Sequence, residues 1–376
     1  MALITYLTRI QFDFGAVRLL PEELALLRVR RPLIVTDKGI VAAGLLPRVH
    51  DVLKTPPAGI YDKTPANPTE EAVVEAHALY RASEADGVIA IGGGSSMDLA
   101  KAVALLATHD GPLRQYALIE GGAARIKPNV APVIAVPTTA GTGSEVGRGA
   151  VIVFNDKRKL GAISPHLIPR VAICDPELTL GLPRGLTAAT GLDALAHCIE
   201  TFLSPVINPP AEAIALDGGI RAMRFLERAV ADGTDREARW QMMMASMEGA
   251  MAFQKGLGAV HAMSHPLGAL PGLNLHHGTL NAVVMPAVLR FNADHVGDKY
   301  DRLRVAFGLG PKTDLAAFIA DLNARLGLPP GLRAMGVREE HIPGLVDAAL
   351  ADHCAATNPR KLTAPDLDHL FRDALG

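Results

Sequence analysis

The sequence predicts a two-domain protein with an α/β N-terminal domain, built on a mainly parallel sheet, and an all-helical C-terminal domain. Three observations carry this prediction. β-rich runs alternate with helical patterns through residues 1–182, segments rich in Ala, Met and Leu fill residues 183–376, and no repeat of fixed period is present. Alternating strands and helices are typical of βαβ units, whose parallel strands are covered on both faces. A length of 376 residues also favours two domains over one.

The first half begins with a predicted buried strand at residues 31–37 (RPLIVTD), followed by a predicted helix at 39–53. A later helix has a start signal, with Asn67 as its N-cap, Pro68 in its first turn and Glu70 three residues after the cap. The remaining elements predicted here are strands at 58–63, 87–94, the start of 131–145, 149–155, 159–164 and 171–175, and a helix at 95–108.

The character of the chain changes near residues 182–185. Long segments with helical spacing follow, at 185–204, 209–230 and 236–257, and no later segment has a strand pattern. We therefore place the boundary after residue 182. The methionines between residues 242 and 251 suggest a soft metal site, but flexible apolar side chains on a buried helix are the better interpretation.

Composition excludes several classes of function. A net charge of -2 with no basic block disfavours a nucleic-acid surface. No apolar run reaches the roughly 18–20 residues of a membrane span, and the first 15 residues lack a basic start and a cleavage site, so no signal peptide is expected. Cys174, Cys198 and Cys354 are too few and too scattered for a disulfide framework, which favours the cytoplasm.

Two loops after predicted strands are candidates for binding a nucleotide. Residues 92–96 (GGGSS) offer backbone N–H groups to phosphate at the start of a helix, although a plain tight turn fits them equally well. Residues 138–145 (TTAGTGSE) add hydroxyls, and both loops would lie at the carboxyl ends of a Rossmann-like parallel sheet. A carboxylate at Asp37 would bind the ribose hydroxyls of NAD and repel the 2′-phosphate of NADP; a helix cap is the alternative role.

Residues 190–278 contain a cluster of potential metal ligands. Asp193 and His197 are four residues apart, as are His261 and His265, so each pair shares one face of a helix. A further imidazole follows in His276 and His277. Single histidines on apolar helices are usually core residues. Burying Asp193 among imidazoles without a cation would cost several kcal/mol, however, so the spacing predicts a divalent transition metal.

Five motifs together resemble the iron-containing (group III) alcohol dehydrogenases. They are GGGSSMDLAK from residue 92, PTTAGTGSEV from 137, GLDALAHCIE from 191, HAMSHPLGA from 261 and HHGTLNA, which covers residues 276–282. The resemblance spans nearly the whole chain in order. It implies a nucleotide-binding α/β domain, residues 1–182, and a helical, metal-binding catalytic domain, residues 183–376.

The resemblance also implies roles for individual residues. Its metal ligands fall on Asp193, His197, His261 and His277, and His265 becomes a proton carrier beside the nicotinamide. The implied cofactor-binding residues are Asp37, Asn67, Gly93, Gly94, Ser95, Ser96, Thr138, Thr139, Thr142 and Lys159.

Two departures from the family pattern affect these assignments. The segment between His265 and the last ligand is about two residues longer than in the family pattern, so His276 is an alternative to His277 as that ligand. In the family pattern a glycine follows the last ligand, and Gly278 therefore favours His277. Gly147 stands where many members have threonine, so one hydroxyl near the cofactor is missing.

The expected function is a metal-dependent, NAD-linked alcohol dehydrogenase, which transfers hydride reversibly between a primary alcohol and NAD to give an aldehyde. The resemblance favours Fe²⁺, whereas the ligand set also suits Zn²⁺ or another divalent transition metal. It also implies a homodimer or larger homo-oligomer, with a small alcohol or aldehyde as its substrate. The charge and the length of the apolar runs predict no nucleic-acid or membrane partner.

Three alternatives remain. The nearest is a reductase of a carboxylated substrate on the same fold, similar to maleylacetate reductase or a hydroxy-acid semialdehyde dehydrogenase. The others are a lyase similar to dehydroquinate synthase, disfavoured by the few basic residues near the metal motifs, and a catalytically silent binding protein, disfavoured by the complete ligand set.

Overall fold

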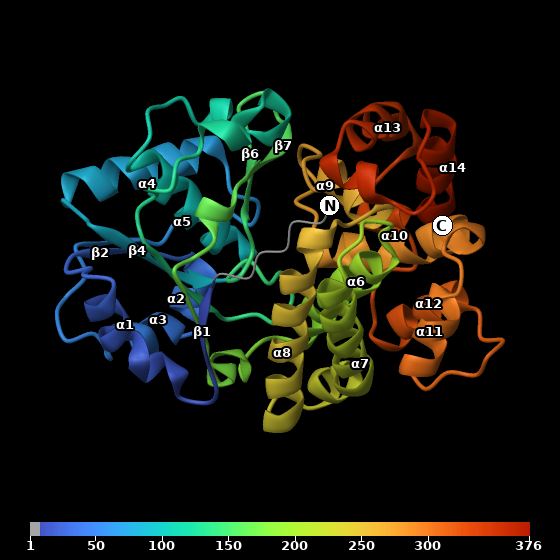
Figure 1. Ribbon diagram of the computed structural model, residues 1–376, viewed down its shortest axis with the longest axis horizontal. Helices are drawn as coiled ribbons and strands as arrows, with labels where there is room; N and C mark the ends of the chain where they lie inside the picture. Colours follow the sequence, from blue (N-terminus) through green and yellow to red (C-terminus); the bar gives the residue numbers. More distant parts are fainter. Residues whose placement is uncertain (1–7) are drawn as a thin grey trace. The chain divides into compact units, whose positions relative to one another are not determined.

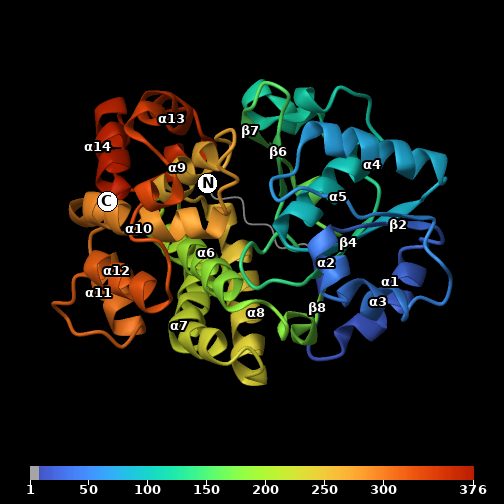
Figure 2. The same cartoon turned by 180° about the vertical axis from the view of Figure 1, so that it is seen from behind.

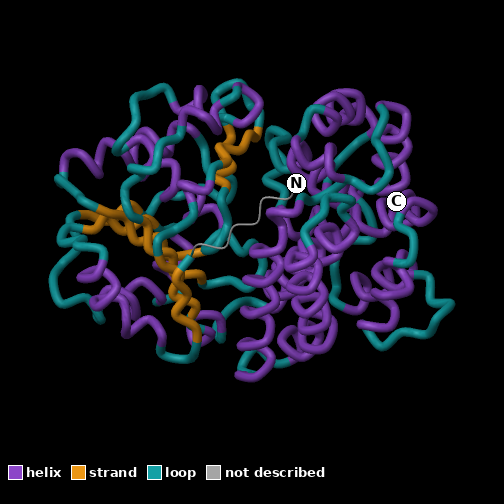
Figure 3. The backbone as a smooth tube through the Cα atoms, viewed as in Figure 1, coloured by secondary structure: helices purple, strands orange, loops and turns teal. Residues whose placement is uncertain are grey.

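The computed structural model describes residues 8–376 and divides the chain into two compact units. The first, here called the sheet unit, holds the described residues up to Thr139 together with Ser144–Gly181. The second, here called the helical unit, holds Ala140–Gly143 and Leu182–Gly376. Figure 3 shows that the named strands all belong to the first of these. The N-terminal segment in which no signal peptide is expected begins in residues 1–7, outside the described part.

Within residues 8–376, six strands of the sheet unit form one parallel sheet in the order β1-β8-β5-β4-β2-β3. The predicted fold class is therefore confirmed. The elements are β1 (Arg9–Phe12), α1 (Leu20–Leu26), β2 (Pro32–Val35), α2 (Lys38–Ala42), α3 (Leu45–His50), β3 (Gly59–Tyr61), α4 (Glu70–Ala82), β4 (Gly87–Gly92), α5 (Gly94–Leu106), β5 (Val133–Pro137), β6 (Gly149–Val153), β7 (Lys159–Ile163) and β8 (Val171–Cys174).

Helices cover both faces of this sheet, α1 to α3 one face and α4 and α5 the other (Figures 1 and 2). Neighbouring strand residues alternate between two apolar cores, as the pleat requires. Leu33 packs with Val73 of α4 and Val103 of α5, whereas Ile34 packs with Leu20 of α1. Strands buried on both faces must be apolar throughout, and for this reason short runs such as PLIV predict them well.

Two features of the strands go beyond what the sequence predicts. β1 pairs with β8 at the edge of the sheet but was not expected, because four residues with two polar side chains give a weak pattern. The predicted strands at 149–155 and 159–164 are present as β6 and β7, but they form a separate antiparallel pair and do not join the parallel sheet. Only five residues connect Val153 to Lys159, whereas a parallel crossover needs about a dozen.

The predicted N-cap of α4 is also wrong. The helix begins at Glu70 and its N-cap is Thr69, whose Oγ1 accepts a hydrogen bond from the N–H of Ala72 at 3.2 Å. Asn67 lies before Pro68, which restricts it to extended backbone. Its side chain instead accepts a hydrogen bond from Lys159, at 2.9 Å. The cap is therefore two residues later than the pattern indicated.

The helical unit contains no strand among its described residues. Its helices α6 to α8 pack closely on one another, and α10 packs on α6, α9, α12 and α14. None of the helices in residues 8–376 has the length and apolar character needed to cross a lipid bilayer. The helices are α6 (Arg184–Leu203), α7 (Pro209–Ala231), α8 (Arg236–Ala252), α9 (Ala259–Leu267), α10 (His277–Asn292), α11 (Lys299–Ala306), α12 (Leu315–Arg325), α13 (Ile342–Leu350) and α14 (Ala364–Leu375).

One segment of the first half packs with the helical unit. Ala140–Gly143 follows β5 in sequence, but its glycines lie against helices of the second unit. A Cβ on Gly141 would lie 2.6 Å from the carbonyl oxygen of Thr190 on α6, and one on Gly143 would lie 2.0 Å from the Cβ of Ala250 on α8. Glycine allows this approach because it has no side chain.

Candidate active site

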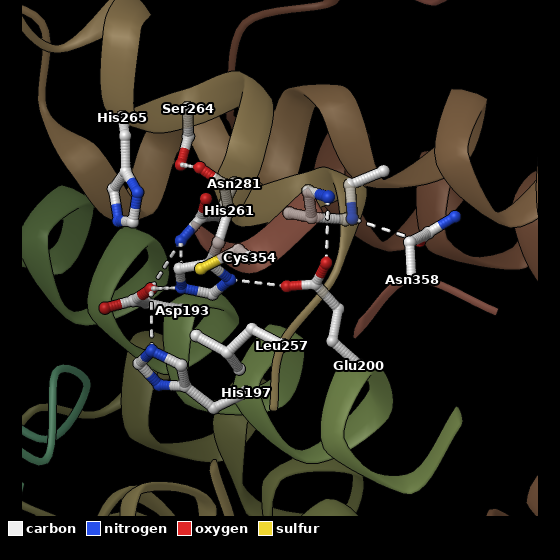
Figure 4. A network of polar contacts seen from close by, with 12 residues as sticks. Asp193, His197, Glu200, Leu257, His261, Ser264, His265, Asn281, Cys354 and Asn358 are labelled. Atoms are coloured by element: carbon white, nitrogen blue, oxygen red, sulfur yellow. Dashed lines mark hydrogen bonds and ion pairs between the residues drawn. The ribbon is translucent and has the colours of Figure 1, made fainter. Parts of the chain in front are cut away.

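Three helices of the helical unit bring the predicted metal ligands together, and Figure 4 shows three of these ligands, Asp193, His197 and His261. Asp193 and His197 lie one turn apart on α6, His261 lies on α9, and His277 is the first residue of α10. Because α10 packs on both α6 and α9, side chains distant in sequence share one buried region. Asp193, His197 and His261 are each less than 5% exposed.

The donor atoms converge on one carboxylate oxygen. Asp193 Oδ1 lies 3.9 Å from His197 Nε2, 3.8 Å from His261 Nε2 and 3.8 Å from His277 Nε2. The ligand atoms of Asp193, His197 and His261 all lie within 4.8 Å of one another. A tetrahedral cation with bonds of about 2.0–2.1 Å separates its ligands by roughly 3.4 Å, so these residues fit a transition metal after small adjustments.

The electrostatics of the cluster also suit a cation. Burial lowers the pKa of His197 to about 4, although Asp193 opposes this shift. Its imidazole is therefore neutral near pH 7 and retains a lone pair for a metal. Burial alone would lower the pKa of His261 as well, but the carboxylates of Glu200 and Asp193 raise it overall.

An amide nitrogen lies where the donor atoms converge. Asn281 Nδ2 is 2.6 Å from Asp193 Oδ1, 3.1 Å from His261 Nε2 and 3.2 Å from His277 Nε2. An amide has two hydrogens to donate, whereas three acceptors face it. A cation can accept lone pairs from all of them. This arrangement is the structural observation that supports metal binding here.

His265 belongs to a second polar group beside the first. Its Nδ1 lies 2.8 Å from Asp352 Oδ2, and its ring stacks on that of His277 with centroids 5.5 Å apart. Burial would raise the pKa of Asp352, but His265 and His353 lower it overall. Asp352 therefore remains a carboxylate and fixes the orientation of the His265 ring.

The two adjacent histidines have different surroundings. His276 is exposed and is the N-cap of α10, with its Nδ1 accepting from the N–H of Thr279 at 3.3 Å. The side chain of His277 is only 26% exposed and is directed toward Asp193. These positions favour His277 as the candidate ligand.

Close helix packing explains the glycines beside these ligands. A Cβ on Gly278 would lie 2.4 Å from the carbonyl oxygen of Ala189 on α6, so only glycine lets α10 approach α6 at this point. A Cβ on Gly249 of α8 would similarly lie 3.1 Å from His197 Cβ. The glycine after His277 therefore has a packing function.

The sheet unit gathers most of the predicted cofactor residues. Asp37 follows β2, Gly93 and Gly94 follow β4, and Thr138 and Thr139 follow β5, and these three strands are neighbours in the sheet. The residues also contact one another. Ser96 Oγ donates to Asp37 Oδ2 at 3.2 Å, and Lys159 Nζ donates to Asn67 Oδ1 at 2.9 Å.

Several polar groups at this edge have unused hydrogen-bonding capacity. Helix α5 begins without a side-chain cap at Gly93, which leaves its first N–H groups for a ligand. In the described part of the chain, the buried Oγ1 atoms of Thr138 and Thr139 have no hydrogen-bond partner. Thr142 belongs instead to the helical unit. Asp37 also caps α2, accepting from the N–H of Ile40 at 3.0 Å, so both roles considered for it are compatible.

Sequence reasoning missed three polar residues that contact the candidate site. Asn281 is four residues after His277 and Glu200 is three residues after His197, so helical spacing places both on the ligand faces. That spacing was a usable signal. Asp352 lies 87 residues from His265, and no local pattern indicates their contact.

Comparison with known proteins places the whole chain in a family. The family model "Iron-containing alcohol dehydrogenase" matches residues 8–176, and the model of the C-terminal part of the Fe-containing alcohol dehydrogenase family matches residues 187–375. The chain belongs to the iron-containing alcohol dehydrogenases. The predicted family and enzyme class are thus confirmed: the protein is an alcohol dehydrogenase, an oxidoreductase acting on CH–OH groups.

Individual alcohol dehydrogenases of this family match over their full length. The chain is 58% identical over 382 residues to 4-hydroxybutyrate dehydrogenase of Cupriavidus necator, covering 100% of both proteins. Among solved structures, 1,3-propanediol oxidoreductase has a TM-score of 0.91 at 34% identity, with 99% of this chain and 100% of that chain covered. Sulfoacetaldehyde reductase from Bifidobacterium kashiwanohense, in complex with NAD+, has a TM-score of 0.89 at 28% identity, with 100% and 99% covered.

Proposed function

We propose that this protein is an NAD-dependent, Fe²⁺-containing dehydrogenase that oxidises 4-hydroxybutyrate to its semialdehyde. The convergence of three imidazoles on one carboxylate oxygen, Asp193 Oδ1, is the observation that carries the chemistry. The 58% identity to the 4-hydroxybutyrate dehydrogenase of Cupriavidus necator supports the substrate. 4-Hydroxybutyrate is a primary alcohol, as the main prediction requires, and it also carries the carboxylate of the alternative substrates.

In this proposal each candidate site residue has a defined role. Asp193, His197, His261 and His277 hold the metal, which supplies Lewis-acid polarisation of the substrate hydroxyl when bound. The reaction removes a hydride from the carbinol carbon and a proton from the hydroxyl. His265, fixed by Asp352, accepts and releases that proton.

The proposed cofactor site lies at the edge of the sheet unit. The N–H groups that begin α5 bind the pyrophosphate, and Asp37 binds the adenosine ribose and repels a 2′-phosphate. Within residues 8–376, the buried hydroxyl oxygens of Thr138 and Thr139 have no hydrogen-bond partner, which supports a polar ligand there. The NAD+ complex of sulfoacetaldehyde reductase supports the choice of NAD.

We further propose a cytoplasmic homo-oligomer. Within the described residues, Cys174, Cys198 and Cys354 are all free and buried, which supports a reducing compartment. The oligomeric state rests on the family resemblance alone, and light scattering of the purified protein measures it directly.

A substrate panel tests the proposed function. Protein loaded anaerobically with Fe²⁺ is assayed with 4-hydroxybutyrate, 1-butanol and 1,3-propanediol, each with NAD+ and NADP+. We expect the highest kcat/KM for 4-hydroxybutyrate with NAD+. A preference for 1,3-propanediol would favour the neutral-alcohol function of the 1,3-propanediol oxidoreductase that this chain resembles.

The metal centre is tested separately with Asp193→Ala. Because Asp193 Oδ1 is the shared centre of the cluster, we expect metal content and activity to be lost together. The metal dissociation constant should increase by more than the roughly 10–100-fold that follows when a residue hydrogen-bonded to a ligand is removed. Full activity of chelated, metal-free protein would contradict the proposed role of the metal.

A further inference from the structure

Glu200 is a buried carboxylate that none of the assigned roles uses. It lies on α6, three residues after His197 and seven after Asp193, so helical geometry directs it to the same side of the helix. The residue is only 6% exposed. A carboxylate in such surroundings must be hydrogen-bonded or paired, because its desolvation is otherwise unfavourable by several kcal/mol.

Both oxygens of Glu200 contact the beginning of α9 (Figure 4). Oε1 accepts a hydrogen bond from the N–H of Val260 at 2.8 Å. Oε2 makes a short contact with Nδ1 of His261, the next residue. An ionised carboxylate has no hydrogen to donate, so the hydrogen in this contact belongs to His261 Nδ1.

A hydrogen on Nδ1 of His261 determines the state of Nε2, the other nitrogen of that ring. With a hydrogen on Nδ1, a neutral imidazole has its lone pair on Nε2. His261 Nε2 is the atom that lies 3.8 Å from Asp193 Oδ1, among the candidate ligand atoms. Carboxylate–histidine pairs of this kind orient the imidazole and increase its basicity toward a metal.

The described contact of His261 Nδ1 is with a carboxylate oxygen, Glu200 Oε2. The described contact of His277 Nδ1 is with a neutral hydroxyl, Ser264 Oγ, at 3.5 Å. That distance is long for a hydrogen bond. Glu200 therefore acts on one particular ligand of the cluster.

We propose that Glu200 is a positioning residue of the metal centre, which holds His261 in the tautomer with a hydrogen on Nδ1 and so directs the Nε2 lone pair to the metal. The proposal rests on the metal centre proposed above. Glu200 touches neither substrate nor metal in this account, and it acts through His261.

The variant Glu200→Gln tests this role. Glutamine has nearly the same shape, and its carbonyl can still accept from the N–H of Val260. Its NH₂ group can only donate to His261 Nδ1, which favours a hydrogen on Nε2, where the metal must bind. We expect the dissociation constant for Zn²⁺, measured by competition with a chromophoric chelator, to increase by about 10–100-fold.

A matched control separates tautomer control from support of the helix. Asn358 Oδ1 accepts from the N–H of Ala259 at 3.0 Å, so it holds the same end of α9 without touching His261. We expect Asn358→Ala to lower the thermal unfolding midpoint but to leave the Zn²⁺ dissociation constant close to that of wild type. An equal loss of affinity in both variants would show a merely structural role and overturn the proposal.

A second measurement does not depend on any variant of Glu200. NMR spectra of metal-free protein, labelled with ¹⁵N in histidine side chains, report which ring nitrogen carries the hydrogen. We expect His261, assigned by its loss in His261→Gln, to have the hydrogen on Nδ1 in wild type; a hydrogen on Nε2 overturns the proposal even if Glu200→Gln does not fold.

The two proposals fail in different ways. If Asp193→Ala binds Zn²⁺ as tightly as wild type, the metal centre itself is wrong. If Asp193→Ala loses the metal while folded Glu200→Gln keeps wild-type affinity, only the role of Glu200 is wrong.

Discussion

Single side chains in this protein serve structure and chemistry at the same time. Asp37 caps α2 with one carboxylate oxygen and accepts from Ser96 with the other. Asp193 is at once a buried helix residue and the centre of the donor cluster. For such residues, an informative substitution removes the chemical role and retains the structural one.

Asp37→Ser meets this condition. Serine caps helices about as well as aspartate, but it lacks the charge that would repel the 2′-phosphate of NADP. We expect the ratio of kcat/KM for NADP+ to that for NAD+ to increase by roughly tenfold, equivalent to about 1.4 kcal/mol of removed repulsion. The thermal unfolding midpoint should stay unchanged. An unchanged cofactor ratio would leave Asp37 with its capping role alone.

Glu145 gives a pH-dependent prediction at the same scale. Burial raises its pKa to about 7, against a smaller opposing effect of Lys101. Between about pH 4.5 and 7 the unfolded chain therefore binds fewer protons at this site than the folded chain, and this contribution to stability falls as pH rises. Glutamine resembles the neutral acid and does not titrate.

We expect Glu145→Gln to gain stability relative to wild type as the pH rises from 5 to 8, by on the order of a few kcal/mol. Urea unfolding of both proteins at each pH measures the difference. A difference in the free energy of unfolding that stays constant over this range would contradict the raised pKa.

At the scale of elements, α6 is held by contacts near both of its ends. Its C-terminal carbonyls accept hydrogen bonds from two lysine side chains, since Lys255 and Lys299 both donate to Phe202 and Ser204. Cations are favourable at this end of a helix, where carbonyl groups lack helical partners. Near the other end, Gly278 lets α10 approach the backbone of Ala189. The spacing of the candidate ligands depends on both contacts.

Gly278→Ala tests the second of these contacts. The new Cβ would lie 2.4 Å from a backbone oxygen of α6, so α10 must move and carry His277 away from Asp193. We expect a folded protein with metal affinity reduced by at least tenfold, which corresponds to about 1.4 kcal/mol. Gly344→Ala is the matched control, because an added Cβ there meets no heavy atom of the described residues within 4 Å. Equal metal affinity in the two variants would show that close packing at Gly278 does not position His277.

At the scale of the whole molecule, the proposed metal connects three helices of one unit. Metal binding should stabilise the folded state by RT ln(1 + [M]/Kd), about 2.7 kcal/mol at a free metal concentration of 100 Kd. Because all four candidate ligands belong to the helical unit, we expect slower hydrogen exchange of amides in α6, α9 and α10. The amides of α4 and α5 in the sheet unit should change little. Exchange that slows equally in both units, or in neither, would contradict this localisation.

Local pattern was sufficient for much of this protein. Apolar runs predicted β2, β4, β5 and β8, because strands buried on both faces are apolar throughout. The i,i+4 spacing predicted that Asp193 and His197 share a helix face, since helical geometry is fixed by the backbone. The order and composition of the motifs were enough for the family. The assignments of individual site residues, and the domain limits at 182 and 183, stay predictions.

Other features depended on contacts between distant residues, which local pattern does not contain. The pairing of β6 with β7 instead of the main sheet, the packing of Ala140–Gly143 with the helical unit, and the contact of Asp352 with His265 are of this kind. The sequence alone determined which elements form and which side chains are available for chemistry. Only the tertiary structure decided that Glu200 meets His261 and that Asn281 meets Asp193 and His261, because helix packing brings these side chains together.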